Sequence, residues 1–559
     1  MIRRFFIYLC LIFSLVAVTL ACLFGVGLSF LAVPFSVGEL PPRMTILLIP
    51  LDSRPPCTSY VESLAHMAGM KVILPPSDLL DEYRRPGNVA GLQEWLQRNI
   101  YRADAAIVSV DMLTYGGLLT SRQGTGTAGA IEKTLALLSY VHETHPRVKV
   151  YAFNIIPRLL IADDVRTEKY KQPMADWSML QDTVSLFENP RDVARLQELE
   201  TLIPADIRDH YRSLYAANSH LNQQLWGLAQ KGVLAGLVLG QDDSAPFGLG
   251  NLERRRLDNA LASHPDLSNR LFITRGTDEV AISLLGKVAA SAENPGHKVY
   301  IHFTEEHAAD TIMPYMPGPL FQTIDEKLAL AGAQVTDSIP SADYILVIHA
   351  GNPHSQPKRL TAEANRIKAW VQAGRSVALV DLAKDWRADQ TLLPYLRRNG
   401  TPVYQLVAYA GWNTASNSIG TAVTQASMVL LGRVRAPEQA AVSRETARLG
   451  FLAARLLDDW YYQKVYRPVL NADLQKRGIN PYDLQQAQEA VTLQVNHHLY
   501  NAWLQLVYWD WRNATWSLPP DKKPSYAIAG WKLHSGLPWD RTFEIFVEAT
   551  PAPARIISQ

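Results

Sequence analysis

Ten short apolar runs rich in β-branched residues recur along the 559-residue chain and constrain its fold more than any other feature. Their hydrophobicity is continuous rather than alternating, which predicts strands that are buried on both faces. Helix-like stretches separate most of the runs, and this alternation predicts a mostly parallel α/β architecture covered by helices. The runs are ILLIPL (46–51), KVILP (71–75), AAIVSVD (105–111), KVYAFNII (149–156), VLAGLVLG (233–240), LFITR (271–275), KVYIHF (298–303), YILVIHA (344–350), SVALVDL (376–382) and VYQLVAY (403–409).

The number of strands limits how they can be arranged. Ten strands are too many for one plain eight-stranded barrel, so two arrangements remain open. One is a pair of adjoining doubly wound sheets, and the other is a TIM-like barrel with additions. We assign residues 44–435 to this α/β domain, which the first arrangement would divide into two subdomains.

Two regions depart from the strand–helix alternation. No strand pattern occurs between Arg158 and Val233, and Asn189 followed by Pro190 is typical of a helix start. We therefore predict a helical insertion over about 159–232. The region 436–559 has long helical patterns, holds seven of the 13 tryptophans and ends in a β-like pattern. We predict a helical, tryptophan-rich C-terminal region that ends in β structure.

The N-terminus carries an apolar block of unusual length. Arg3 and Arg4 precede a stretch from Phe5 to Gly38 that has no charged residue. A membrane span needs about 20 apolar residues, whereas the core of a cleaved signal needs only about 7–15. We predict an uncleaved signal anchor and linker over 1–43, with residues 5–33 in the bilayer; a cleaved signal is the alternative. The two arginines favour a cytoplasmic N-terminus and an extracytoplasmic soluble part.

Charge and missing motifs exclude several classes of function. The formal net charge of +1 gives no general reason to bind nucleic acid, and no nucleic-acid partner is expected. The chain lacks a Walker A loop, a GxSxG elbow and a GxGxxG strand–helix turn. ATP hydrolysis, serine esterase chemistry and dinucleotide redox chemistry are therefore not expected, and no cofactor is predicted.

Polar side chains gather directly after the predicted strands. Ligands of parallel α/β folds bind beyond the carboxyl ends of the strands. Loops that served only as connectors would be richer in Gly, Pro and Ser. We therefore expect a site for a saccharide or another polar small molecule at this edge. The candidate substrate-binding residues are Asp52, Arg54, Asp111, Asn154, Arg158, Arg275, Asp278, Asn352, Asp381, Trp412 and Asn413.

Six motifs occur in order along the same loops. They are PLDSRPP, DMLTYGGL, NIIPR, GQDDSAPFG, ITRGTDEVA and AYAGWNTASNSIGTA. In these motifs the chain resembles DUF4127, a bacterial domain family of unknown function, from about Ile46 to the PWDRTFEI stretch near the C-terminus. The resemblance implies a protein of the bacterial cell envelope. It implies no activity and no catalytic residue, because the family's name carries none.

Asp242 and Asp243 are the sharpest chemical feature. Adjacent residues at a strand end point in different directions, so one carboxylate can act as acid or base while the other orients the substrate. Close like charges also raise the pKa of one carboxyl, which suits a general acid. The pair is similar to the catalytic aspartates of hexosaminidases that use substrate assistance. Trp412 could stack on a sugar, and Asn413 could bind its hydroxyls.

The candidate arginines suggest what else the substrate carries. Arg54, Arg122, Arg158 and Arg275 each follow a predicted strand. If these side chains converge, they would bind a carboxylate or phosphate, as found on acidic envelope sugars.

The leading hypothesis is a membrane-anchored extracytoplasmic hydrolase of a cell-envelope or exogenous saccharide, with Asp242 and Asp243 as the catalytic pair. One alternative is a non-catalytic envelope protein that binds a ligand or acts as a scaffold. A further alternative is a metal-dependent hydrolase, although a zinc-protease HExxH motif is absent. Its candidate ligands are Asp52, Asp111, Asp242, His302 and His349.

Overall fold

All ten predicted strands are present in the computed structural model, where they form two open parallel sheets. The α/β domain is therefore built on two doubly wound sheets, and the barrel arrangement does not occur. The tenth strand is shorter than predicted and spans only Ala408–Ala410. The structure describes residues 31–36, 40–124, 128–161, 167–293, 296–352, 354–434, 436–518 and 524–557.

The first sheet has six strands in the order β3-β2-β4-β5-β6-β7, and every neighbouring pair is parallel. The second has five parallel strands in the order β12-β11-β10-β8-β9. The first sheet contains β2 (Thr45–Ile49), β3 (Lys71–Ile73), β4 (Ala105–Ser109), β5 (Lys149–Ile156), β6 (Gly236–Gln241) and β7 (Leu271–Arg275). The second contains β8 (Lys298–Phe303), the short unpredicted β9 (Gln334–Val335), β10 (Tyr344–His349), β11 (Val377–Asp381) and β12 (Ala408–Ala410).

Both sheets follow the same topological rule. In each, the second strand in sequence lies on one side of the first strand, and all later strands lie on the other side. The strand order therefore reverses between β2 and β4 in the first sheet, and between β8 and β10 in the second. Ligands of doubly wound folds bind beyond the carboxyl ends of the strands at such a reversal.

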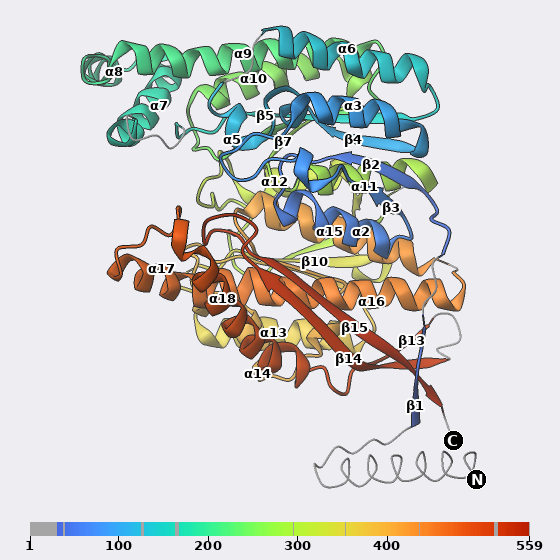
Figure 1. Ribbon diagram of the computed structural model, residues 1–559. Helices are drawn as coiled ribbons and strands as arrows, with labels where there is room; N and C mark the ends of the chain where they lie inside the picture. Colours follow the sequence, from blue (N-terminus) through green and yellow to red (C-terminus); the bar gives the residue numbers. More distant parts are fainter. Residues whose placement is uncertain are drawn as a thin grey trace.

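The elements stack in five layers, and the two sheets share the middle one (Figure 1). Apolar side chains of both sheets and of the middle helices form one core, which includes Leu48, Leu284 and Leu346. The middle helices are α2 (Ser59–Met67), α11 (Val280–Glu293), α12 (Leu320–Leu330) and α15 (Ala415–Arg433). The other face of the first sheet is covered by α3 (Val89–Asn99), α6 (Ala128–Thr144), α9 (Ala205–Gln230) and α10 (Leu249–Ala262). The other face of the second sheet is covered by α13 (Pro357–Gln372) and α14 (Leu393–Arg398), while α16 (Glu438–Arg455) lies beside the edge strand β12 and contacts α2.

Helices fill the region where no strand was predicted. They are α7 (Lys171–Phe187), α8 (Pro190–Leu202) and α9. The Asn189 side chain accepts a hydrogen bond from the Arg191 N–H at 3.0 Å, which is the N-cap expected before Pro190. Tyr211 and Leu221 of α9 are buried in the core on the outer face of the first sheet. The insertion thus lies over the sheet whose strand ends carry the paired aspartates.

The C-terminal region is helical and ends in an antiparallel sheet. Its helical part consists of α16, a π-helix over Leu456–Tyr466, α17 (Arg467–Lys476), α18 (Gln488–Trp503) and a short π-helix over Leu504–Tyr508. Its strands are β13 (Thr515–Ser517), β14 (Ser525–Gly536) and β15 (Phe546–Ile557), which pair in the order β15-β14-β13, with a fourth strand on the other side of β15.

The fourth strand of that sheet comes from the N-terminal part of the chain. Residues 5–30 of the predicted membrane segment lie outside the described residues. Its last residues were predicted to lie in the bilayer, but Leu31–Pro34 forms strand β1, because its main chain pairs antiparallel with β15. Within the described ranges, no helix combines the length and the apolar character that a membrane span requires.

A buried ion pair fixes the middle layer to the first sheet. Lys327 of α12 places its Nζ 2.5 Å from Glu279 Oε1, at the start of α11, and both side chains are fully buried. Lys327 also donates a hydrogen bond to Thr274 Oγ1 in β7 at 2.7 Å. Burial raises the pKa of Glu279, and Lys327 opposes that rise. Removing either charge would leave the other one buried without its partner.

We expect Lys327→Met to lower the free energy of unfolding by about 3–5 kcal/mol, because Glu279 then remains as an unpaired buried charge. Denaturant titration followed by tryptophan fluorescence measures the change. Adding Glu279→Leu should recover most of the loss. As a matched control, Arg98→Met breaks an exposed ion pair with Glu94 and should cost less than about 0.5 kcal/mol. An equal loss in the control, or no recovery in the double variant, would contradict this account.

Candidate functional site

Arg54 lies at the centre of a buried cluster beyond β2. Its Nη2 is 2.6 Å from Asp52 Oδ2 and 2.6 Å from Asp278 Oδ1, and its Nε donates to Asp52 Oδ1 at 3.0 Å. Burial alone would lower the pKa of Arg54, but Asp278 and Asp52 raise it well above its ordinary value. The cluster therefore holds a permanent cation between the loops that follow β2 and β7.

Asp278 extends this cluster to the second sheet. Its Oδ2 accepts hydrogen bonds from Asn413 Nδ2 at 2.9 Å and from Asn417 Nδ2 at 3.2 Å. Both asparagines follow β12, so the strand ends of the two sheets meet at this carboxylate. Asn413 has a φ of 50°, a left-handed conformation that asparagine tolerates better than most residues. Three of the predicted loops thus come together at Asp278.

The C-terminal region completes the cluster with residues that the sequence reasoning did not select. The Arg54 guanidinium lies over the Trp539 ring at 5.1 Å, and Arg54 Nε is 3.6 Å from Glu544 Oε1. Trp539 Nε1 donates to the Ser53 hydroxyl at 2.8 Å. The PWDRTFEI stretch contains both C-terminal residues, so its presence among the family motifs was the available signal.

Asp242 forms a second cluster one residue beyond β6. Its Oδ2 accepts hydrogen bonds from Arg122 Nε at 2.9 Å and Arg122 Nη2 at 2.5 Å. Its Oδ1 accepts from the Thr277 hydroxyl at 3.0 Å, and Thr277 directly precedes Asp278 of the first cluster. Burial would raise the pKa of Asp242, but Arg122 and Arg158 outweigh it and lower that pKa. Asp242 is therefore held as a carboxylate.

Asp243 differs from Asp242 in its hydrogen bonding and in the direction of its pKa shift. It is partly exposed, and its carboxylate has no hydrogen-bond or ion-pair partner among the residues that the structure describes. Burial and the neighbouring Asp242 raise the pKa of Asp243 to about 7. Two adjacent aspartates therefore differ in protonation near neutral pH, which separates an acid from a base at one strand end.

A cavity of about 230 Å³ opens beside Asp242. The inserted helix α9 forms one wall with His210 and Ser213, while Asp111 and Ser121 lie on another wall. Burial raises the pKa of Asp111 to about 7, although the Ile155 N–H and Ser121 donate hydrogen bonds that oppose the rise. The cavity therefore carries an ionised Asp242 and a readily protonated Asp111 on one polar surface.

Two of the candidate residues are held elsewhere. Arg275 pairs with Glu326 of α12 and donates to Gln322, so α12 draws its side chain away from both clusters. Asp381 accepts hydrogen bonds from the Leu392 and Leu393 N–H groups at 2.7 and 3.1 Å, where it fixes the start of α14.

Three further candidates also lie outside the two clusters. Asn154 is fully buried beneath α9 and donates to Asn222 Oδ1 at 2.8 Å. Asn352 lies on an exposed turn, where it accepts from the His354 N–H at 2.9 Å. Trp412 is 6% exposed, and its ring packs against Tyr60 in the core, which leaves little surface for stacking on a sugar.

The second sheet places a protein carboxylate at its own strand-order reversal. Glu305, after β8, accepts hydrogen bonds from the Ala350 and Gly351 N–H groups at 3.1 and 3.0 Å, after β10. Glu305 is also 3.1 Å from His349, whose other ring nitrogen lies 2.6 Å from the Gln390 carbonyl. Burial alone would lower the pKa of His349, but Glu305 raises it above its ordinary value. This carboxylate therefore joins the loops that follow β8 and β10.

The geometry lends no support to a metal centre in the described ranges. No group of three or more His, Cys, Asp or Glu side chains is arranged there to hold a metal ion. The two candidate histidines lie apart, His302 at 2.7 Å from Glu363 and His349 beside Glu305.

Comparison with known protein families covers most of the chain. Residues 46–548 match the model of a family described as "Protein of unknown function (DUF4127)". The chain belongs to this family. No curated protein matches the chain, and no solved structure matches it. The DUF4127 match includes all the loops described above, together with Trp539 and Glu544.

We expect Arg54→Met in this DUF4127 protein to destabilise the fold by about 3–5 kcal/mol at neutral pH, because Asp52 and Asp278 would face each other without a cation. Burial raises the pKa of Asp278, so this carboxyl takes up a proton readily as the pH falls. The loss should therefore be smaller at pH 5 than at pH 7.5. Thermal unfolding at both pH values measures it.

Arg195→Met, which removes an exposed charge paired with Glu198, serves as the control and should change little at either pH. A loss for Arg54→Met that grows as the pH falls would show that repulsion between the two aspartates is not its cause.

Proposed function

We propose that this DUF4127 protein is a membrane-anchored extracytoplasmic hydrolase that acts on a cell-envelope or exogenous saccharide through Asp242 and Asp243. The observation that carries the proposal is the opposite ionisation of the two adjacent carboxyls. Arg122 and Arg158 lower the pKa of Asp242, whereas the pKa of Asp243 is raised to about 7. Pairs of titratable groups with separated pKa values are what acid–base chemistry at neutral pH requires.

Each aspartate has a distinct role in the proposed reaction. Asp243 donates its proton to the glycosidic oxygen as the bond to the sugar carbon breaks. Asp242 orients the substrate group that supports the positive charge on that carbon. A water molecule then adds to the carbon, and its proton passes to Asp243, which restores the starting state. Arg122 acts only through Asp242, because it keeps that carboxyl ionised.

The cavity beside Asp242 supports a substrate site next to this carboxylate, and Asp243 follows directly in the chain without lining the cavity itself. It lies beyond the carboxyl ends of β4, β5 and β6, where ligands of α/β folds bind. Its walls combine hydroxyl, imidazole and carboxyl groups with the apolar side chains of Leu118 and Leu214. Such a mixture suits a sugar ring, which has polar edges and apolar faces.

The proposed compartment depends on the N-terminal sequence. Arg3 and Arg4 precede the uncharged block, which favours a chain that leaves the cytoplasm after residue 33. We expect protease added to intact protoplasts to digest residues 40–559, because these residues would lie outside the membrane. Cytoplasmic proteins in the same sample should remain undigested. Digestion only after the membrane is broken would contradict this orientation.

We expect kcat/KM on a saccharide substrate to fall as the pH rises through about 7, because Asp243 loses the proton that it must donate. Asp243→Asn should remove this alkaline limb and lower kcat/KM by about 10²–10⁴-fold. Asp242→Asn should lower kcat/KM and move the limb to lower pH, because the Asp242 charge helps to raise the pKa of Asp243. Rates on aryl glycosides and on cell-wall fragments, measured from pH 4 to pH 9, test both expectations.

Asp266→Asn, on an exposed turn, is the matched control and should leave the profile unchanged. The assignment fails if the Asp242→Asn, Asp243→Asn double variant matches the wild type on every substrate that is turned over.

A ligand-binding protein without catalysis is the second candidate. It is favoured by the ion pairs of Asp52, Asp278 and Asp242 with arginines, which leave these carboxylates unavailable as acids. A binding protein predicts that a saccharide raises the melting temperature without being cleaved, and that Asp243→Asn keeps this stabilisation. Cleavage that depends on Asp243 would exclude it.

A further inference from the structure

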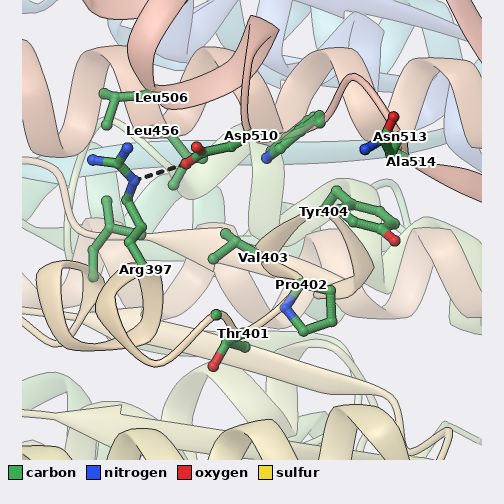
Figure 2. Close-up of a pocket in the computed structure, with 13 residues that line it drawn as sticks. Arg397, Thr401, Pro402, Val403, Tyr404, Leu456, Leu506, Asp510, Asn513 and Ala514 are labelled. Atoms are coloured by element: carbon green, nitrogen blue, oxygen red, sulfur yellow. Dashed lines mark hydrogen bonds and ion pairs between the residues drawn. The ribbon is translucent and has the colours of Figure 1, made fainter. Parts of the chain in front are cut away.

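A second cavity, of about 340 Å³, lies apart from both clusters (Figure 2). One side is formed by α14 and by residues 400–404, which lead into the amino end of β12. The other side is formed by residues 506–514, which follow α18. The Asp242 cavity, in contrast, lies beyond carboxyl strand ends of the first sheet. A ligand here would therefore not reach Asp242 or Asp243.

Both apolar and polar side chains line this cavity. Val403, Leu456 and Leu506 give it an apolar base, and each of these side chains is at most 5% exposed. Arg397 and Asp510 lie together at one end, with Arg397 Nε 2.9 Å from Asp510 Oδ2, and Tyr404 and Asn513 lie at the other end (Figure 2). The cavity thus has polar groups at both ends, and Leu456 and Leu506 lie beside the Arg397–Asp510 pair (Figure 2).

The charges and polar groups exclude most classes of ligand. One arginine and one aspartate sum to no net charge, so nothing here selects a phosphate, a nucleotide or an acidic peptide. A wholly apolar ligand would desolvate the Arg397–Asp510 pair and Asn513 without replacing their hydrogen bonds with water. What remains is a neutral ligand with apolar faces and many hydroxyl groups. A sugar ring has this chemistry.

Aromatic side chains strengthen the case. Tyr404 is half-buried and lines the cavity, while Trp511 is 1% exposed and only packs beside the Tyr404 ring, with ring centroids 6.3 Å apart. Tyr508 and Trp509 immediately precede Asp510 and are 38% and 53% exposed, with ring centroids 5.1 Å apart. Aromatic faces offer the apolar contact that the C–H face of a sugar ring prefers. Exposed rings next to the cavity in sequence would let a longer glycan continue beyond it.

We propose that this cavity is a non-catalytic binding site for a neutral saccharide, held between Tyr404, Asn513 and the Arg397–Asp510 pair. The volume lies near the lower end of the range of about 300–1,000 Å³ for small-molecule sites, so one or two sugar rings would fill it. This site is argued from its own chemistry and stands whether or not Asp242 and Asp243 are catalytic.

The test uses the full-length protein in a detergent without a sugar headgroup, since a maltoside would compete. Chitotriose, cellotriose and maltotriose are titrated separately by calorimetry and by saturation-transfer NMR. We expect at least one of them to bind, and Tyr404→Ala to weaken that binding by about tenfold or more. Tyr404→Phe keeps the ring and should retain most of the affinity. Asn513→Ala, at an exposed position, should weaken binding without disturbing the fold.

Asp243→Asn is the control for the other cavity and should leave this affinity unchanged, which separates failure of this proposal from failure of the proposed catalysis. Three outcomes would overturn the proposal: no binding of any of the three saccharides, binding that Tyr404→Ala and Asn513→Ala leave intact, or binding that Asp243→Asn abolishes.

Discussion

The structure depends on one cation, the guanidinium of Arg54, at the point where its parts meet. It contacts Asp52 from its own loop, Asp278 from the far edge of the first sheet, and Trp539 and Glu544 from the C-terminal region. Asp278 in turn binds Asn413 after the last strand of the second sheet. A charge buried this deeply is stable only when several anions converge on it, so both sheets and the C-terminal region must be folded before Arg54 is satisfied. The DUF4127 match spans all of these segments.

Asp242 and Asp243 show how two adjacent carboxyls at one strand end can have different pKa values. Asp242 points toward Arg122 and the cavity beneath α9, whereas Asp243 has no such partner in the described part of the chain. The difference in pKa follows from the different groups that each carboxyl faces, and not from the residue type. The helical insertion matters for the same reason, because α9 closes the cavity that Asp242 lines.

The ten strands could be predicted because short, continuous apolar runs rich in β-branched residues are typical of strands covered on both faces. Asp52, Asp242 and Asp278 could be predicted to gather for a similar reason, since parallel strands bring their carboxyl ends to one edge. The direction of the Arg275 side chain could not be predicted, because its partner Glu326 lies on α12. The residues around Arg275 do not indicate where α12 packs. Asp381 ends a strand like the others but caps α14 instead, and sequence cannot distinguish these two uses of a carboxylate. Trp539 and Glu544 were missed because they lie almost 500 residues from Arg54 and follow no strand of either parallel sheet.

Glu305 distinguishes the strand-order reversal of the second sheet from that of the first sheet. Its carboxylate sits on backbone N–H groups at the strand-order reversal of the second sheet, much as a bound anion would. The loops after β8 and β10 are therefore held together by a side chain of the protein itself. The carboxyl strand ends of the first sheet instead face a cavity, beside Asp242.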